Sequence, residues 1–325
     1  MNRNIGIDII RGISALLIVS YHYTCHYNLS PYTAVGHTEW GFVVPWGCWA
    51  VVTFFMISGY LSSGKVKDDA KPINLLKRRF LRLYPTFWAA MLVTFIITSI
   101  AKYDSYTIKD ILLNVTMLPS LFGAKPIDGV YWTQQYEVLF YLILVGLISI
   151  RRSKYINWAL LLWTLFSVVL YLIQIKIDNP LVSSLRVFAI PQYCSAFIAG
   201  MLIRNFTGRK DIVLSVVVLI ISVVNFWLWH DTGQTTFFVI TLLVLAAIII
   251  CPPHIPQKWE HLLRPILFVS SISYPLYLVH QKIGYTMILN MVTGLHWHSE
   301  WMLLIPFCVV LLLAWMLHKF VEVKF

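Results

Sequence analysis

An arginine and a histidine lie eleven positions apart in an otherwise almost wholly apolar stretch, "RGISALLIVSYH" at 11–22. Eleven residues of α-helix advance about 16.5 Å and turn only about 20° past three full circles, so Arg11 and His22 share a face. Asp8 lies close to the same stripe. A guanidinium binds anions, and a neutral imidazole serves as a general base. This face therefore predicts anion binding at one end and proton transfer at the other.

A purely structural role is the alternative interpretation. Asp8 and Arg11 could form an ion pair that only fixes helix packing, with His22 hydrogen-bonded to a neighbouring helix. At membrane depth, an ionisable group is costly unless it is paired or faces a watery cavity. We favour function, because ionisable residues inside spanning segments usually mark functional sites.

The chain that must position these groups has the composition of a membrane protein. Of its 325 residues, 59% are hydrophobic and 12% charged, whereas soluble domains carry about 25% charge. Mean hydropathy is +0.74. Apolar runs long enough to cross a bilayer predict an all-α polytopic protein of about ten transmembrane helices. These fall at 5–25, 41–61, 80–100, 130–150, 156–175, 185–203, 212–229, 235–251, 265–290 and 301–318, and 107–122 suits a tilted or interfacial helix better than a span.

The distribution of cations predicts the topology. An even number of spans places both termini on one side, and with that side cytoplasmic, 18 of the 25 lysines and arginines fall on inner segments. Both termini are therefore expected in the cytoplasm. The net charge of +11 then reflects topology and anionic lipid contact rather than nucleic-acid binding. We expect one membrane domain over 1–325, a retained first helix, and neither a disulfide framework nor a metal site among the five scattered cysteines.

Five motifs follow one another along the chain. They are Arg11 with His22, "FFMISGY" at 54–60, "RRFLRLYP" at 78–85, "WTQQYEVLFY" at 132–141 and "SYPLYLVH" at 273–280. In this order they resemble acyltransferase family 3, integral-membrane enzymes that transfer acyl groups, often acetyl, from coenzyme A to cell-surface carbohydrates. The resemblance implies acetyl-CoA or another acyl-CoA as donor, no metal, and a bacterial cytoplasmic membrane location.

Some members of that family carry an added extracytoplasmic hydrolase-like domain, which we expect this chain to lack. The acceptor must then come to the membrane. That requirement favours a lipid-linked oligosaccharide, a surface polysaccharide or a separate partner protein.

The resemblance assigns the basic inner segment to the acyl donor. Arg78, Arg79 and Arg82 lie within about one helical turn, and guanidinium groups match phosphate oxygens, so these arginines would hold the phosphates of coenzyme A. Tyr84 would stack on the adenine or shape the helix entry.

Ser58 and Gly59 are predicted at the depth of Arg11. The hydroxyl could bond a pantetheine amide, and the glycine permits close approach. Plain helix packing is the alternative for this pair of small residues.

The acceptor side is predicted around Glu137, which lies near the depth of His22 and could orient its imidazole. An ion pair of Glu137 with Arg186 or Lys282 is the alternative. The acceptor-side candidates are Trp132, Gln135 and His280. Trp132 could equally belong to an interfacial aromatic belt, and His280 could equally be a buried, hydrogen-bonded histidine.

Several questions stay open at the level of sequence. His22 could deprotonate a carbohydrate hydroxyl or accept the acyl group itself, and Trp132, Gln134 or Tyr136 could stabilise the oxyanion. Two histidine clusters, His22 with His26 and "LHWHSE" at 295–300, lack a recognised zinc spacing.

A transporter of lipid-linked sugar or polysaccharide is the rival function, although no inverted repeat is evident. A catalytically silent membrane scaffold is the third possible function.

Overall fold

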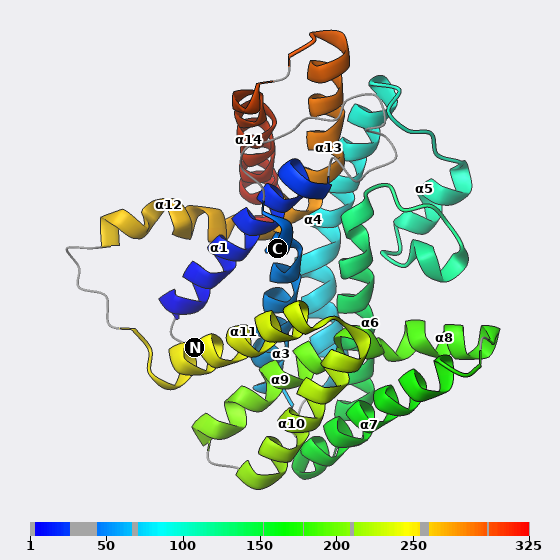
Figure 1. The fold of residues 1–325 in the computed structure, drawn as a ribbon, viewed down its shortest axis with the longest axis vertical. Coiled ribbons are helices and arrows are strands. Elements are labelled where there is room, and N and C mark those ends of the chain that lie inside the picture. Colours follow the sequence, from blue (N-terminus) through cyan, green and yellow to red (C-terminus); the bar gives the residue numbers. More distant parts are fainter. Residues whose placement is uncertain are drawn as a thin grey trace. The chain divides into compact units, whose positions relative to one another are not determined.

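A computed structural model describes residues 4–26, 44–66, 71–151, 153–177, 179–208, 211–253, 260–297 and 299–324. Throughout these ranges the secondary structure is helical, with no strand, as Figure 1 shows. A helix satisfies its backbone hydrogen bonds internally, which a chain this apolar needs in lipid. The prediction of an all-α protein is confirmed.

The α-helices are of very unequal length. In chain order they are α1 (Ile5–Tyr21), α3 (Val51–Ser63), α4 (Pro72–Ile100), α5 (Ile108–Asn114), α6 (Trp132–Ser149), α7 (Ile156–Gln174), α8 (Pro180–Ala189), α9 (Pro191–Gly208), α10 (Ile212–Trp229), α11 (Thr232–Ile250), α12 (Glu260–Ser271), α13 (Ser273–Gly294) and α14 (Leu304–Phe320). A π-helical segment, η1 (His22–His26), continues α1, and two 3-10 segments, η3 (Pro45–Ala50) and η5 (Gly129–Tyr131), precede α3 and α6.

Seven helical stretches of the described chain are long and apolar enough to cross a membrane, or up to eight if the pair formed by α12 and α13, bent by 66°, is one span. The predicted spans at 41–61 and 130–150 are not among them. One reason is length, since α3 has 13 residues. The other is polarity, since the first turns of α6 hold two glutamines and a glutamate. The number ten and the orientation of the termini therefore stay predictions.

The short predicted segment at 107–122 is present as α5, with 7 residues, followed by a 3-10 turn at Pro119–Phe122. Thr107 caps α5 in a capping box with Asp110. This reciprocal pair satisfies backbone donors that a helix N-terminus leaves open.

The chain divides into two compact units. The first comprises Met1–Ile7, Val51–Arg78 and Tyr136–Pro256, and the second comprises Asp8–Ala50, Arg79–Gln135 and Gln257–Phe325. The boundaries fall inside α1, α4 and α6, so neither unit is a continuous stretch of sequence.

In the first unit, α9 is the central helix and packs against α3, α7, α10 and α11. Two glycines make the contact with α3 close: a Cβ at Gly59 would meet the carbonyl oxygen of Phe197, and one at Gly200 would meet that of Met56. Small residues that let two backbones approach are typical of helix packing in membranes. Phe140 stacks on Phe197 beside this contact, and the ring of Phe55 lies against Phe197 at a tilt.

In the second unit, α13 is the central helix and α14 packs along it, as the orange and red ribbons of Figure 1 show. Most side chains of α13 between Ser273 and Val292 are buried. Both η1 and η5 contact α13 as well. This packing brings the end of α1 and the entrance of α6 onto the same helix.

Candidate functional site in the second unit

His22 begins the π-helical segment that ends the first helix. Its side chain is 9% exposed, and its Nδ1 lies 2.9 Å from the carbonyl oxygen of Ile18. A π-helical turn widens the backbone, and such turns are frequent at functional sites.

His280 of α13 lies directly against His22. It is fully buried, its Nε2 is 3.0 Å from Nδ1 of His22, and the two rings meet edge to face with centroids 4.8 Å apart. Nδ1 of His280 lies 2.8 Å from the carbonyl oxygen of Tyr277. The two histidines are 258 positions apart in the sequence.

The carbonyl partners determine the tautomers of the pair. A carbonyl oxygen only accepts, so Nδ1 carries the hydrogen in both rings. Nε2 of His280 then accepts from Nδ1 of His22, which shares its hydrogen with Ile18. In the neutral ring, Nε2 of His22 consequently carries the lone pair. This is the protonation state in which an imidazole acts as a base.

Contacts on both sides hold α1 and η1 against α13. Arg11 donates from Nη2 to Oγ of Ser273 at 3.0 Å, and the Tyr23 hydroxyl donates to the carbonyl oxygen of His280 at 2.9 Å. The ring of Tyr23 lies against Gly284, where a Cβ would clash with it. The arginine and the histidine of the first motif therefore both contact the helix that begins with "SYPLYLVH".

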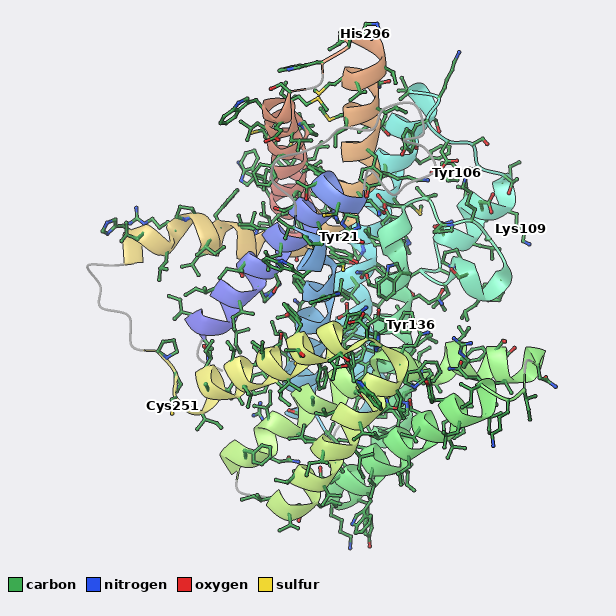
Figure 2. All side chains as sticks on the ribbon, in the orientation of Figure 1. Tyr21, Tyr106, Lys109, Tyr136, Cys251 and His296 are labelled. Atoms are coloured by element: carbon green, nitrogen blue, oxygen red, sulfur yellow. The ribbon has the colours of Figure 1, made fainter. Side chains whose placement is uncertain are left out.

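A charged cluster surrounds α13 two residues beyond His280. Nζ of Lys282 forms an ion pair with Asp104, which also pairs with Lys125, and it lies 2.6 Å from the hydroxyl of Tyr106. Tyr106 precedes α5 in Figure 2. Burial opposes ionisation of Asp104, but the hydrogen bonds and charges of the two lysines hold its pKa below the ordinary value.

Asp128 completes this cluster. It is fully buried and accepts from the backbone N–H of Lys282 at 3.1 Å and of Val130 at 3.2 Å. Burial raises the pKa of Asp128 to about 6, against the lowering effect of those N–H groups and of the Lys282 charge. The carboxyl group thus joins the entrance of α6 to the helix that carries His280.

Glu137 belongs to the first unit, where its Oε1 accepts from Oγ of Ser58 at 3.1 Å and from the hydroxyl of Tyr141 at 3.2 Å. In the described part of that unit it makes no ion pair with Arg186, which lies over the ring of Trp229. The orienting contacts of His22 in the second unit come from Ile18 and His280. A catalytic role for Glu137 stays a prediction.

The predicted donor-binding residues differ in exposure. Arg78 and Arg82 are exposed, whereas Arg79 is buried. Tyr84 stacks on Phe80, and its hydroxyl donates to the carbonyl oxygen of Thr116 at 3.0 Å. This hydrogen bond ties α4 to the segment after α5. The adenine contact of Tyr84 stays a prediction. The same holds for the predicted donor contacts of Arg11, Ser58, Gly59, Arg78, Arg79 and Arg82.

The acceptor-side candidates also differ in exposure. Trp132 is 36% exposed, whereas Gln135 and His280 are buried. The described residues contain no group of three or more histidine, cysteine or acidic side chains placed to hold a metal ion. His296 lies beyond the C-terminal end of α13 in Figure 2, and His298 lies outside the described residues.

Sequence reasoning missed much of what surrounds the histidine pair. Ser273 and Tyr277 lie in the quoted motif "SYPLYLVH", whose serine and tyrosine were the available signal. No sequence signal distinguished Tyr23 from the other aromatic residues of the chain. Asp104 and Asp128 were detectable only as acidic residues in a chain that has 14 of them.

Comparison with known proteins agrees with the motifs. Residues 4–319 match the family model Acyl_transf_3, described as an acyltransferase domain. "Nodulation protein 10" of Rhizobium leguminosarum bv. viciae is 25% identical over 303 residues, covering 81% of this chain and 78% of that protein. No solved structure matches the chain.

Proposed function

Because this chain belongs to acyltransferase family 3, we propose that it is a membrane O-acyltransferase that moves an acyl group, most simply acetyl, from cytoplasmic acyl-CoA to a hydroxyl of a carbohydrate at the outer side. The carbohydrate would be a lipid-linked oligosaccharide or a cell-surface polysaccharide. The apolar helices support a multi-pass membrane location, and family membership does not favour the transporter alternative.

The observation that carries the proposal is the contact between His22 and His280. Nε2 of His22 would take the proton of the acceptor hydroxyl as its oxygen attacks the thioester carbonyl. The C–S bond then breaks, and the protonated His22 returns its proton to the leaving sulfur, which releases coenzyme A as the thiol. His280 and Ile18 accept from Nδ1 throughout, so they orient the ring and stabilise the imidazolium while it exists.

The remaining predicted residues have supporting roles in this proposal. The arginines Arg78, Arg79 and Arg82 would bind the phosphates of coenzyme A. In the second unit, Arg11, held by Ser273, and Tyr84 would contact the acyl donor. Ser58 and Gly59 of the first unit are also proposed as donor contacts. Glu137, fixed by Ser58 and Tyr141, is proposed as a catalytic carboxylate in addition to His22. Trp132 and Gln135 would contact the acceptor.

The first experiment measures transfer of radiolabelled acetyl from acetyl-CoA to oligosaccharides by the purified protein in detergent. We expect His22→Ala to lower kcat at least about 100-fold, the usual contribution of a general base, in protein that still folds. His296→Ala is the matched control, because His296 is exposed beyond α13. Equal activity of His22→Ala and wild type would refute the proposal.

The same assay separates direct transfer from an acetylated His22. A covalent intermediate would exchange labelled coenzyme A into acetyl-CoA without any acceptor, whereas direct transfer requires the acceptor. Because the neutral ring carries its lone pair on Nε2, it could attack the thioester as readily as it could take a proton. We propose direct transfer, so we expect no exchange.

A further inference from the structure

Two adjacent glutamines in the first turn of α6 are buried in the second unit. Gln134 is 5% exposed and Gln135 is 6% exposed. In the part of the chain that the structure describes, neither side-chain oxygen has a hydrogen-bond partner. A buried acceptor left in this state costs free energy, and each such group in a native protein needs an explanation.

The orientation of one amide follows from its neighbour. The Thr133 hydroxyl donates to the carbonyl oxygen of Val130 at 3.0 Å, so its oxygen faces Gln134 as an acceptor. Nε2 of Gln134 lies 3.4 Å from that oxygen. Since only the NH₂ group can donate there, Oε1 is the atom that points away and lacks a donor.

Hydrogen bonds connect this turn to the histidine pair. The carbonyl oxygen of Val130 also accepts from the hydroxyl of Tyr277 at 3.4 Å, and the carbonyl oxygen of Tyr277 faces Nδ1 of His280. The turn at Val130–Gln134 and His280 are thus parts of one buried polar network within the second unit.

An amide oxygen can bind only a group that donates a hydrogen. We infer that Gln134 and Gln135 bind hydroxyl groups of the acyl acceptor other than the one that becomes acylated, which makes the acceptor a polyhydroxylated compound such as a sugar. This inference rests on the proposed function. It gives each of the two buried oxygens a hydrogen-bond donor, because a hydroxyl group of the substrate donates to it.

The test replaces each amide by an unbranched apolar side chain of similar length, in Gln134→Met and Gln135→Met. Gln174→Met, at the last residue of α7 in the first unit, is the matched control. Wild-type protein is first assayed with acetyl-CoA and maltotetraose, cellotetraose and chitotetraose, and the sugar with the highest rate is used afterwards.

We expect each variant to raise the KM for that sugar about 3- to 10-fold, as for loss of one hydrogen bond, with the affinity for acetyl-CoA unchanged. Because each exchange removes an unsatisfied acceptor, the unfolding temperature should stay the same or rise. A deoxy analogue of the sugar that lacks the bound hydroxyl should have the same KM as the sugar itself when both are assayed with the variant. A merely structural glutamine would instead lower the unfolding temperature and leave the KM for the sugar unchanged.

The outcomes separate the two proposals. If wild type acetylates a sugar but both variants keep its KM, or if both lose acetyl-CoA binding and stability together, the glutamine inference is wrong and the acyltransferase proposal stands. If wild type acetylates only simple alcohols, the inference is wrong as well. If wild type transfers acetyl to nothing, the proposed function fails and the inference fails with it.

Discussion

The two histidines of the site each have definite hydrogen-bond partners that determine their chemistry. Nδ1 of His22 donates a hydrogen bond shared between the carbonyl oxygen of Ile18 and Nε2 of His280. Nδ1 of His280 donates to the carbonyl oxygen of Tyr277. In apolar surroundings such contacts are strong, because no water competes for them. The direction of each hydrogen bond, rather than the presence of a histidine, makes Nε2 of His22 the basic atom.

Replacement of His280 should show that it positions His22. His280→Leu removes the acceptor and should lower kcat about 10- to 100-fold, while the KM for acetyl-CoA stays unchanged. His280→Gln places an amide near the position of Nε2 and should recover part of kcat. The measurement is steady-state kinetics with the unfolding temperature of each variant. If His280→Gln and His280→Leu lower kcat equally, His280 does not act by accepting a hydrogen bond from His22 at Nε2.

Asp128 should make stability depend on pH. Its pKa is raised from 3.8 to about 6, so its protonated form is favoured in the folded protein. The protonated carboxyl group of Asp128 makes its full contribution to the free energy of unfolding below pH 3.8. This contribution, on the order of 3 kcal/mol, is lost as the pH rises through about 6. Unfolding temperatures between pH 4.5 and 7.5 should therefore fall less steeply with pH in Asp128→Asn than in wild type.

Asp231→Asn is the control for this series. Asp231 caps α11, and the backbone N–H of Gln234 holds its pKa below the ordinary value, so it titrates below the measured range. Its variant should follow the wild-type slope. An Asp128→Asn slope equal to that of wild type would contradict the burial argument.

At the scale of elements, the site depends on how closely η1 approaches α13. Tyr23 can donate to the backbone of His280 because Gly284, one turn further along, has no side chain. In the first unit, Gly59 and Gly200 bring α3 and α9 together in the same way. Glycine thus sets interhelical distance at both places.

An added methyl group should separate η1 from α13. Gly284→Ala places a Cβ against the ring of Tyr23, so Tyr23 and then His22 must shift, and kcat should fall at least about 10-fold. Gly294→Ala, on the same helix with open space around its Cβ, should keep wild-type activity. The measurement is kcat in the acetyl-transfer assay. Wild-type activity in Gly284→Ala would show that the close approach is dispensable.

At the scale of the whole molecule, the cation distribution predicts that both termini are cytoplasmic. Cys251 follows α11 and is exposed, as Figure 2 shows it at the end of that helix. It should lie on the cytoplasmic side, whereas His296, after α13, should lie on the outer side. The two positions therefore report opposite faces of the membrane.

Thiol labelling in intact cells tests this topology. With the other four cysteines replaced by serine, a membrane-impermeant maleimide should label Cys251 only after permeabilisation. A His296→Cys, Cys251→Ser protein should be labelled in intact cells. Labelling of Cys251 in intact cells would show that the topology is the reverse of the predicted one. The acyl donor could then not reach its proposed site from the cytoplasm.

The sequence by itself determined the helical membrane class, the shared face of Arg11 and His22, and the family, now confirmed by the family model over residues 4–319. Each depends on local properties: apolar runs, helical spacing and the order of short motifs. The segment at 107–122 contains a helix of only 7 residues that is not among the candidate spans, as its length and charges led us to expect, and its tilted or interfacial placement stays a prediction.

Only the tertiary structure showed which distant residues contact Arg11 and His22. The structure places His280, an acceptor-side candidate of the sequence, against His22 and ties Ser273 to Arg11, while orientation of His22 by Glu137 stays a prediction. Helical spacing predicts which residues share a face of one helix. Many helices here present similar apolar faces, so the choice of neighbour depends on small residues and on side-chain packing between distant segments.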